Sequence, residues 1–368
     1  MALEGPASEP HAGPPQGGLG VAPAVGAVLE AFPDAVPLEG TPPAFLLSNT
    51  AGARDRFLAL QRRLAAMGFL PLLRMHEGRP VLRLVPKPPP GRWARHTNLL
   101  LLLATVVTTY ISGYYQALGL AELGFLDDAV ASGMLYSASL LLILGAHEMG
   151  HKIVATRRGI DASLPYFLPM VPLPPLPGTL GAVIVTRTPA PNRDSLMDLG
   201  ASGPIAGFLA AIPVLAYGVT QSFVVRPADV TGAIAYPDPL LIQWMIRLLL
   251  HPDPGMVVLG HPVLYAGWIG LIVTSINLLP AGMLDGGHVV RAALGSRAHA
   301  VLSYAGLALA VVMGYYPMAI IIALLIRRGH VGPLDDLSPL SPSRRVLAAV
   351  LVAIFVLSAV FLHPFGGL

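Results

Sequence analysis

The sequence predicts an α-helical polytopic membrane protein of about six to eight transmembrane helices, with a small membrane-associated β element and a small N-terminal α+β soluble domain. Three observations predict this class. Hydrophobic residues make up 54% of the 368 residues and charged residues only 12%, about half of the roughly 25% that soluble domains carry. Several apolar segments reach the roughly 20 residues that a helix needs to cross a bilayer. The first 90 residues contain no such segment and show shorter helix and strand patterns.

The composition also limits the chemistry. The chain has no cysteine, which excludes disulfides and zinc–thiolate sites, so any metal must be held by His, Asp or Glu. The formal net charge is only +3, which argues against a nucleic-acid partner.

The N-terminal 90 residues divide into two parts. Residues 1–20 are rich in Pro and Gly and are predicted to be disordered. They lack the basic and apolar regions of a signal peptide and the Arg- and Ser-rich composition of a transit peptide, so neither is expected. Residues 21–90 are predicted to form a small α+β domain. An amphipathic helix carries Phe57, Leu60 and Leu64 on one face, and two strands flank the turn HEGR. The Pro-rich stretch 87–92 is predicted to be a stiff linker.

Five apolar segments fit single membrane spans, namely 98–120, 129–155, 199–219, 263–279 and 345–362. The third contains GPIAG at 203–207, a spacing of small residues that lets helices approach closely. The apolar stretch 298–326 is too long for one span and is interrupted by GYYP at 314–317. It is predicted to form two short helices, which brings the total to about seven spans. The stretch 240–251 is short and contains Arg247, which favours an interfacial helix.

The segment 164–187 is apolar but carries six prolines before Gly178. Proline breaks helices, and a membrane tolerates irregular backbone only where protein or a water-filled cavity covers it. We expect a re-entrant or interfacial loop here, followed by a strand around 181–186.

Charge predicts the orientation of the protein in the membrane, because cationic residues flank the first two spans at the ends that would be cytoplasmic: Lys87, Arg92, Arg95, Lys152, Arg157 and Arg158.

The motif AHEMGH, residues 146–151, lies inside the second predicted span. His147 and His151 are four residues apart, so both imidazoles fall on one helical face and can share a metal ion. Glu148 lies beside them, where it can take a proton from an activated water. Three uncompensated polar side chains in lipid would be costly. This pattern therefore predicts a zinc hydrolase site in the membrane rather than a chance match.

A third metal ligand is expected at a similar depth. Asp285 follows an apolar span that Pro280 and Gly282 interrupt. Spacing alone leaves two interpretations open, a metal ligand or a solvated aspartate in a turn. Asn277 could hydrogen-bond a substrate carbonyl or an oxyanion, or form an interhelical hydrogen bond, which spacing alone favours.

AHEMGH in one span and NLLPAGMLDGG in a later one together resemble the site-2 protease family of intramembrane zinc metalloproteases. The segments GTLGA, ASGPIAG and HPVLYAGWIGL resemble the branch that contains the plastid proteins named for ethylene-dependent gravitropism deficiency and yellow-green leaves, with their prokaryotic relatives. The resemblance covers residues 95–362. It implies one Zn²⁺ per chain, with His147, His151 and Asp285 as ligands. It also implies that Glu148 is the general base, that Asn277 assists catalysis, and that the GTLGA strand pairs with an unwound substrate.

The resulting hypothesis is a zinc metalloendopeptidase that cleaves transmembrane segments of membrane proteins in the bilayer. Its predicted location is a prokaryotic plasma membrane, with the N-terminus and the active-site end cytoplasmic. The main alternative is a catalytically silent membrane scaffold or chaperone of the same fold, against which the intact Glu148 argues. A second alternative is a metal transporter. A transporter should spread its polar residues through several spans, whereas the ionisable residues of this chain gather in two segments. The other histidines, His251, His261, His288, His330 and His363, are predicted to be structural or solvated, or carry no functional signal.

Overall fold

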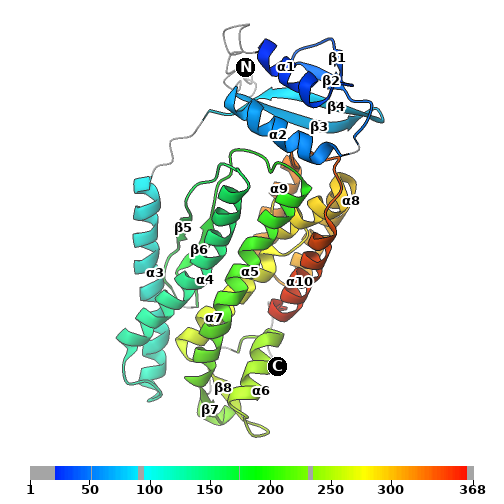
Figure 1. Ribbon diagram of the computed structural model, residues 1–368. Helices are drawn as coiled ribbons and strands as arrows, with labels where there is room; N and C mark the ends of the chain where they lie inside the picture. Colours follow the sequence, from blue (N-terminus) through cyan, green and yellow to red (C-terminus); the bar gives the residue numbers. More distant parts are fainter. Residues whose placement is uncertain (1–20, 51, 90–94, 174, 231–234, 363–368) are drawn as a thin grey trace, which may run out of the picture. The chain divides into compact units, whose positions relative to one another are not determined.

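A computed structural model describes residues 21–50, 52–89, 95–173, 175–230 and 235–362 (Figure 1). The chain divides into two compact units between Lys87 and Pro88. The predicted disordered segment 1–20, part of the predicted linker 87–92, and His363 lie outside the described residues.

The N-terminal unit is a four-stranded antiparallel sheet with two helices. The strands β1 (Val36–Leu38), β2 (Ala44–Leu46), β3 (Phe69–His76) and β4 (Arg79–Pro86) follow the order β1-β2-β4-β3. Helix α2 (Ala53–Ala66) packs against β3, and α1 (Val21–Ala31) packs against α2. The predicted helical face is buried at Phe57, Leu60 and Leu64. Helix α1 and the two short strands β1 and β2 were not predicted.

The turn between β3 and β4 follows directly from the sequence HEGR. His76 pairs with Arg79, which leaves Glu77 and Gly78 as a two-residue loop. Both loop residues have positive φ, 51° and 77°, as the type I′ turns that match strand twist require. Glycine adopts this conformation without a steric penalty.

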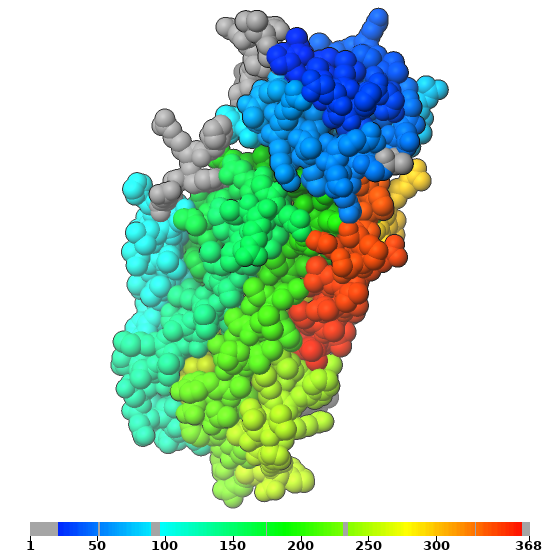
Figure 2. Space-filling view, viewed as in Figure 1, coloured from blue at the N-terminus to red at the C-terminus, as the bar shows by residue number. Residues whose placement is uncertain are grey.

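The C-terminal unit is a helical bundle (Figure 1). Its helices are α3 (Arg95–Glu122), α4 (Ala129–Arg157), α5 (Arg193–Thr220), α6 (Leu240–Leu249), α7 (Pro262–Asn277), α8 (Asp285–Val312), α9 (Tyr316–Arg328) and α10 (Pro342–Ser358). Two short antiparallel pairs join them, β5 (Tyr166–Pro169) with β6 (Thr179–Val183) and β7 (Phe223–Val225) with β8 (Val257–Leu259). A single 3₁₀ turn covers Pro227–Val230. The colours in Figure 2 show α10 packed along α5 on the face displayed.

Four helices among the described residues are long and apolar enough to cross a membrane: His96–Glu122, Ala129–Arg157, Arg193–Thr220 and Asp285–Val312. The first three match predicted spans. The predicted span 263–279 is shorter in the structure, because α7 ends at Asn277 with 16 residues. Such a helix is about 24 Å long, short of the roughly 30 Å hydrocarbon core. The predicted interfacial segment 240–251 contains the helix α6.

The prediction of two short helices over 298–326 is confirmed, although the first of them is joined across a break to an earlier helix. Helix α8 begins at Asp285 and runs for 28 residues, with a break at Gly295 where φ is 85°. The predicted interruption at GYYP is present, because α8 ends at Val312 and α9 starts at Tyr316. Arg291, on the part of α8 before this break, is buried and forms an ion pair with Asp336. A partner from a distant segment is invisible to a hydropathy pattern.

Small residues let the central helices approach closely. A methyl group added at Gly267 would lie 2.4 Å from the Leu215 side chain, and one added at Gly270 would lie 2.8 Å from Ile143. Helices α4, α5 and α7 therefore share one apolar core that includes Leu140, Ile143 and Leu215. In lipid, such close packing replaces the hydrophobic effect as the force that holds helices together.

The Pro-rich loop is anchored by polar side chains of α3 and α4. Asn98 donates to the carbonyls of Leu164 and Pro165 at 3.0 and 2.8 Å, Thr108 to Gly178 at 2.7 Å, and Tyr136 to Pro177 at 3.0 Å. These bonds satisfy backbone carbonyls that the prolines leave without helical partners.

The strand predicted at 181–186 lies earlier in the structure, at Thr179–Val183, and pairs with the unpredicted strand β5. β5 was missed because the prolines at 165 and 169 disguise a short edge strand.

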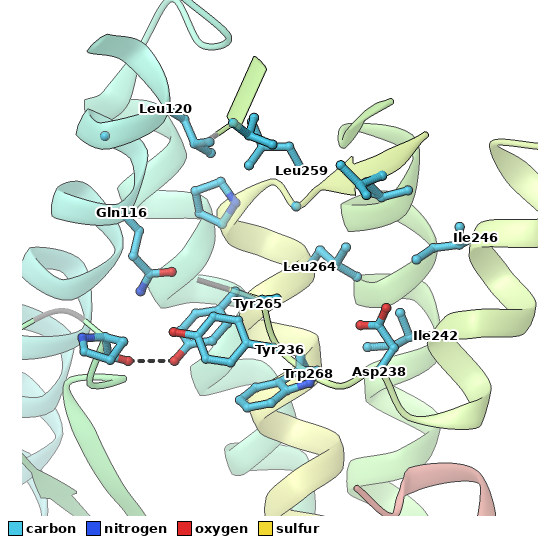
Figure 3. A pocket seen from close by; sticks show the side chains of 18 of the residues that line it. Gln116, Leu120, Tyr236, Asp238, Ile242, Ile246, Leu259, Leu264, Tyr265 and Trp268 are labelled. Atoms are coloured by element: carbon cyan, nitrogen blue, oxygen red, sulfur yellow. Dashed lines mark hydrogen bonds between the residues drawn. The ribbon is translucent and has the colours of Figure 1, made fainter. Parts of the chain in front are cut away.

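A cavity of about 950 Å³ lies among α3, α6, α7 and β8 (Figure 3). Figure 3 shows the rings of Tyr236, Tyr265 and Trp268 gathered at one side of it. The Tyr265 hydroxyl donates to the Pro175 carbonyl at 2.6 Å, so this cluster also anchors the Pro-rich loop. None of the predicted site residues lines this cavity.

Candidate active site

Helix α4 carries three polar side chains into the interior of the bundle. Asp128 caps the start of the helix by accepting from the Ala131 amide at 2.9 Å. Near the other end, His147, Glu148 and His151 are all buried. The Nε2 atoms of His147 and His151 lie 3.2 Å apart. The helical repeat therefore brings both imidazoles to one point, as their spacing predicted.

Asp285, the first residue of α8, lies close to both of these histidines. Its Oδ2 lies 3.2 Å from His147 Nε2, and its Oδ1 lies 3.2 Å from His151 Nε2. The turn before α8 is tight enough to require glycine at the two following positions. A Cβ at Gly286 would lie 2.1 Å from the Leu278 carbonyl oxygen, and one at Gly287 would lie 2.4 Å from that of Gly282. The Asp-Gly-Gly sequence thus lets the chain fold back onto α7 and aim the carboxylate at α4.

These three side chains could hold a metal ion. Their ligand atoms lie within 4.8 Å of one another. The 3.2 Å separations match the edge of roughly 3.3 Å expected for a tetrahedron with zinc–nitrogen bonds of about 2.0 Å. Asp285 Oδ2 is buried without a hydrogen-bond partner, as a carboxylate oxygen reserved for a cation would be. The donor set is therefore chemically and geometrically suited to zinc.

The tautomer of His151 also fits metal binding. Its Nδ1 lies 2.8 Å from the Leu199 carbonyl, to which it donates. The proton is then on Nδ1, and the Nε2 lone pair points to Asp285 and His147. Such an outer hydrogen bond orients a ligating imidazole and raises its basicity.

Glu148 shares one cavity with these residues. The cavity has a volume of about 210 Å³. It is lined by the three potential ligands, by Glu148 and Asn277, and by residues around the end of β6 that include Ala182, Val183 and Ile184. The cavity thus places a carboxylate, a possible metal site and a strand end together.

Asn277 is the last residue of α7, and its Nδ2 lies 3.3 Å from His147 Nε2. It lines the same cavity. All five residues singled out in the sequence therefore lie together, although they come from three helices.

Helix α5 packs against the site through three glycines. A methyl group at Gly203 would lie 2.0 Å from His151 Nε2, one at Gly207 3.1 Å from His147, and one at Gly200 2.9 Å from the His288 side chain. The GPIAG spacing was predicted to permit close helix packing, and the structure shows that the close neighbours are the imidazoles themselves.

Sequence reasoning overlooked a second group of histidines beside the cavity. His288 Nδ1 lies 2.7 Å from His330 Nε2, and the His299 ring packs at 5.0 Å against that of His330. His299 donates from Nε2 to the Gly282 carbonyl at 2.9 Å. His288 lines the cavity. The i, i+3 spacing of Asp285 and His288 was the one signal in the sequence that could have placed His288 on the same helical face.

Comparison with known proteins agrees with this geometry. The family model of Peptidase family M50 matches residues 135–321. The chain is 30% identical over 234 residues to the probable zinc metalloprotease EGY1 of Arabidopsis thaliana, covering 60% of this chain and 41% of that protein. It is 29% identical over 296 residues to EGY3 of Oryza sativa subsp. indica, covering 72% and 48%.

The chain spans less than half of the length of these chloroplastic relatives. No solved structure matches it significantly. The family match covers more than half of the chain and contains the HExxH motif and the Asp-Gly-Gly turn. This protein belongs to Peptidase family M50, the site-2 protease family.

Proposed function

We propose that this protein is an intramembrane zinc metalloendopeptidase that hydrolyses peptide bonds in or near transmembrane segments of other membrane proteins. One observation carries the proposal: a buried His-His-Asp donor set of tetrahedral spacing shares a cavity with the carboxylate of Glu148. His147, His151 and Asp285 would hold the metal. A zinc ion bound there supplies the Lewis acidity that makes water a nucleophile at neutral pH.

Glu148 is the proposed general base. It follows His147 directly, so its side chain lies beside the ligand face of α4 rather than on it. Its carboxylate accepts a proton from the attacking water and then delivers it to the nitrogen of the leaving amine. Asn277 is proposed to donate from Nδ2 to the carbonyl oxygen of the scissile peptide. Its position at the cavity wall, 3.3 Å from His147 Nε2, supports this role.

The strand β6 is the proposed binding edge for the substrate. A helical substrate hides its carbonyls in its own hydrogen bonds, so it must unwind before hydrolysis. β6 pairs with β5 along one edge, and its end at Ala182 and Val183 borders the cavity. An extended substrate segment can add to the other edge through backbone hydrogen bonds.

The proposed topology has seven membrane helices. The four long helices α3, α4, α5 and α8 span the bilayer, and α7, α9 and α10 complete the bundle. The ends of α4 and α9, the starts of α5 and α10 and the site then lie on the cytoplasmic side. The cationic residues at these ends support this orientation: Lys152, Arg157, Arg158, Arg193, Arg327 and Arg344.

The test is cleavage of a panel of reporter transmembrane segments by the purified protein in bilayers with zinc. Wild type and a Glu122→Ala control, changed at an exposed glutamate at the end of α3, should cut the same segments. Glu148→Ala should bind zinc normally and cut none. Zinc removal by a chelator should stop cleavage, and added zinc should restore it. A wild type that binds zinc but cuts no segment would refute the proposal and favour a silent scaffold.

A further inference from the structure

His288 lines the cavity of the active site and has one ring nitrogen without a hydrogen-bond partner in the described part of the chain. It lies one helical turn after Asp285 on α8, on the same face, and lines the same cavity. Its Nδ1 faces His330 at 2.7 Å. Among the described residues, its Nε2 has no hydrogen-bond partner. A side chain that lines the cavity therefore has a ring nitrogen available for a ligand.

The proton on that nitrogen is determined by a chain of hydrogen bonds. The backbone amide of Gly332 donates to His330 Nδ1 at 2.8 Å, so this nitrogen has no proton. A neutral imidazole carries its proton on one nitrogen only, so His330 is protonated on Nε2. That N–H donates to His288 Nδ1, which must then accept. The proton of His288 is consequently on Nε2, the ring nitrogen that His330 does not contact.

The segment that carries His330 is firmly held. Residues 329–341, here called the strap, connect α9 to α10. Arg291 donates to both carboxylate oxygens of Asp336, at 2.8 and 2.6 Å, and both side chains are mostly buried. The amide of Leu334 donates to the Ala190 carbonyl at 2.8 Å, and that of Asp335 to Pro191 at 2.9 Å. These contacts hold the strap in place and thereby fix the position of His330.

We propose that His288 is a catalytic hydrogen-bond donor whose Nε2–H binds a carbonyl oxygen of the substrate peptide, and that His330 is the positioning residue that holds it in this tautomer. The inference rests on the proposed protease function. His288 would act alongside Asn277, which reaches the cavity from α7. Two donors from different helices would orient the peptide plane as well as bind it.

A purely structural role would make the pair of histidines only a clamp between the strap and α8. The two roles differ in the effect of glutamine, whose amide can donate from the position of Nε2. We therefore compare His288→Leu, His288→Gln, His330→Leu and His330→Gln in the full-length protein in bilayers. The matched control is His299→Gln, because an amide can retain the bond to the Gly282 carbonyl.

Three quantities are measured for each variant: kcat and KM on a reporter segment that wild type cuts, zinc content, and thermal stability. His288→Leu should lower kcat by about 100-fold at full zinc content, the usual effect of removing one donor to a reacting carbonyl. His288→Gln should recover most of this loss. His330→Leu should lower kcat by about twofold, since His288 then divides its proton between its two ring nitrogens and about half of the molecules hold the donor tautomer. His330→Gln and His299→Gln should remain near wild type.

The tautomer is read directly from ¹⁵N resonances of histidine in the metal-free protein. We expect protonated Nε2 at His288 in wild type and a mixture of tautomers in His330→Leu. A proton on Nδ1 of His288 would overturn the proposal. So would wild-type kcat in His288→Leu, or equal losses of kcat and stability in the leucine and glutamine variants. Absence of cleavage by wild type would instead refute the protease function, while the tautomer still decides whether His288 is a donor.

Discussion

Replacing Gly203 with alanine should abolish metal binding while the fold remains intact. A Cβ at this position would lie 2.0 Å from His151 Nε2 and 2.5 Å from the two adjacent ring carbons. Ordinary contacts begin at 3.4 Å, so the ring must retreat by about 1.4 Å, the difference between these two distances. A working metal site holds its ligand distances within about 0.2 Å. The displaced imidazole can no longer serve as a ligand.

The size of the effect follows from that displacement. Disturbing only the outer partners of metal ligands costs about 10–100-fold in affinity, so moving the ligand atom itself should cost at least about 100-fold. This corresponds to about 2.8 kcal/mol of binding free energy. The fold should survive because the obstructing atom is the far end of a side chain that can rotate. Alanine also favours a helix interior over glycine, by roughly 0.5–1 kcal/mol.

The assay is zinc affinity by competition with a chelator, together with thermal stability of the metal-free protein. Gly145→Ala on α4 is the matched control, because its added Cβ would meet only the Phe167 ring at 3.9 Å. It should bind zinc as wild type does. If Gly203→Ala binds zinc within threefold of wild type, then His151 is not a ligand or α5 does not pack as described.

Three further changes test other parts of the site and its support. Asp285→Asn should lower zinc affinity by at least about tenfold in the same competition assay, since a neutral amide is a poorer ligand than a carboxylate. Asp336→Asn should lower the free energy of unfolding by about 3 kcal/mol because it leaves the buried charge of Arg291 without its partner. Asp229→Asn, in an exposed pair, should leave the free energy of unfolding nearly unchanged because solvent screens that pair. Burial lowers the pKa of His330 to about 2. Below the unfolded pKa of about 6.5, therefore, only the unfolded chain takes up this proton. The free energy of unfolding is highest above that pH and is lower by at most about 2 kcal/mol at pH 5. His330→Gln should remove this part of the pH dependence of Tm, and an unchanged dependence would contradict the assignment.

Much of the fold follows from local patterns. The helices α3, α4 and α5 coincide with long apolar segments, and the turn at Glu77 and Gly78 follows from four residues. The errors lie where local patterns conflict with distant partners. The part of α8 before Gly295 was not predicted, and its Arg291 is paired with Asp336, 45 residues away in the sequence. β5 was missed because its prolines obscure an edge strand.

The site shows the same division. His147 and His151 share a helical face at any tertiary arrangement, because four residues make about one turn of an α-helix. The proximity of Asp285 and Asn277 was expected from the family resemblance, and spacing alone left their roles open. Nothing in the sequence connected His330 to His288, since the contact depends on how residues 329–341 fold back against residues 190–191 and α8.

The sequence by itself therefore determined the membrane character, the long helices and the pair of histidines on α4, because each depends on residues close in the chain. The tertiary structure decided the distances that join Asp285 to that pair, the need for glycine at 203, and the hydrogen-bonded chain from Gly332 to His288. These features depend on contacts between segments far apart in the chain. Such contacts arise only when the helices pack, and no local propensity encodes them.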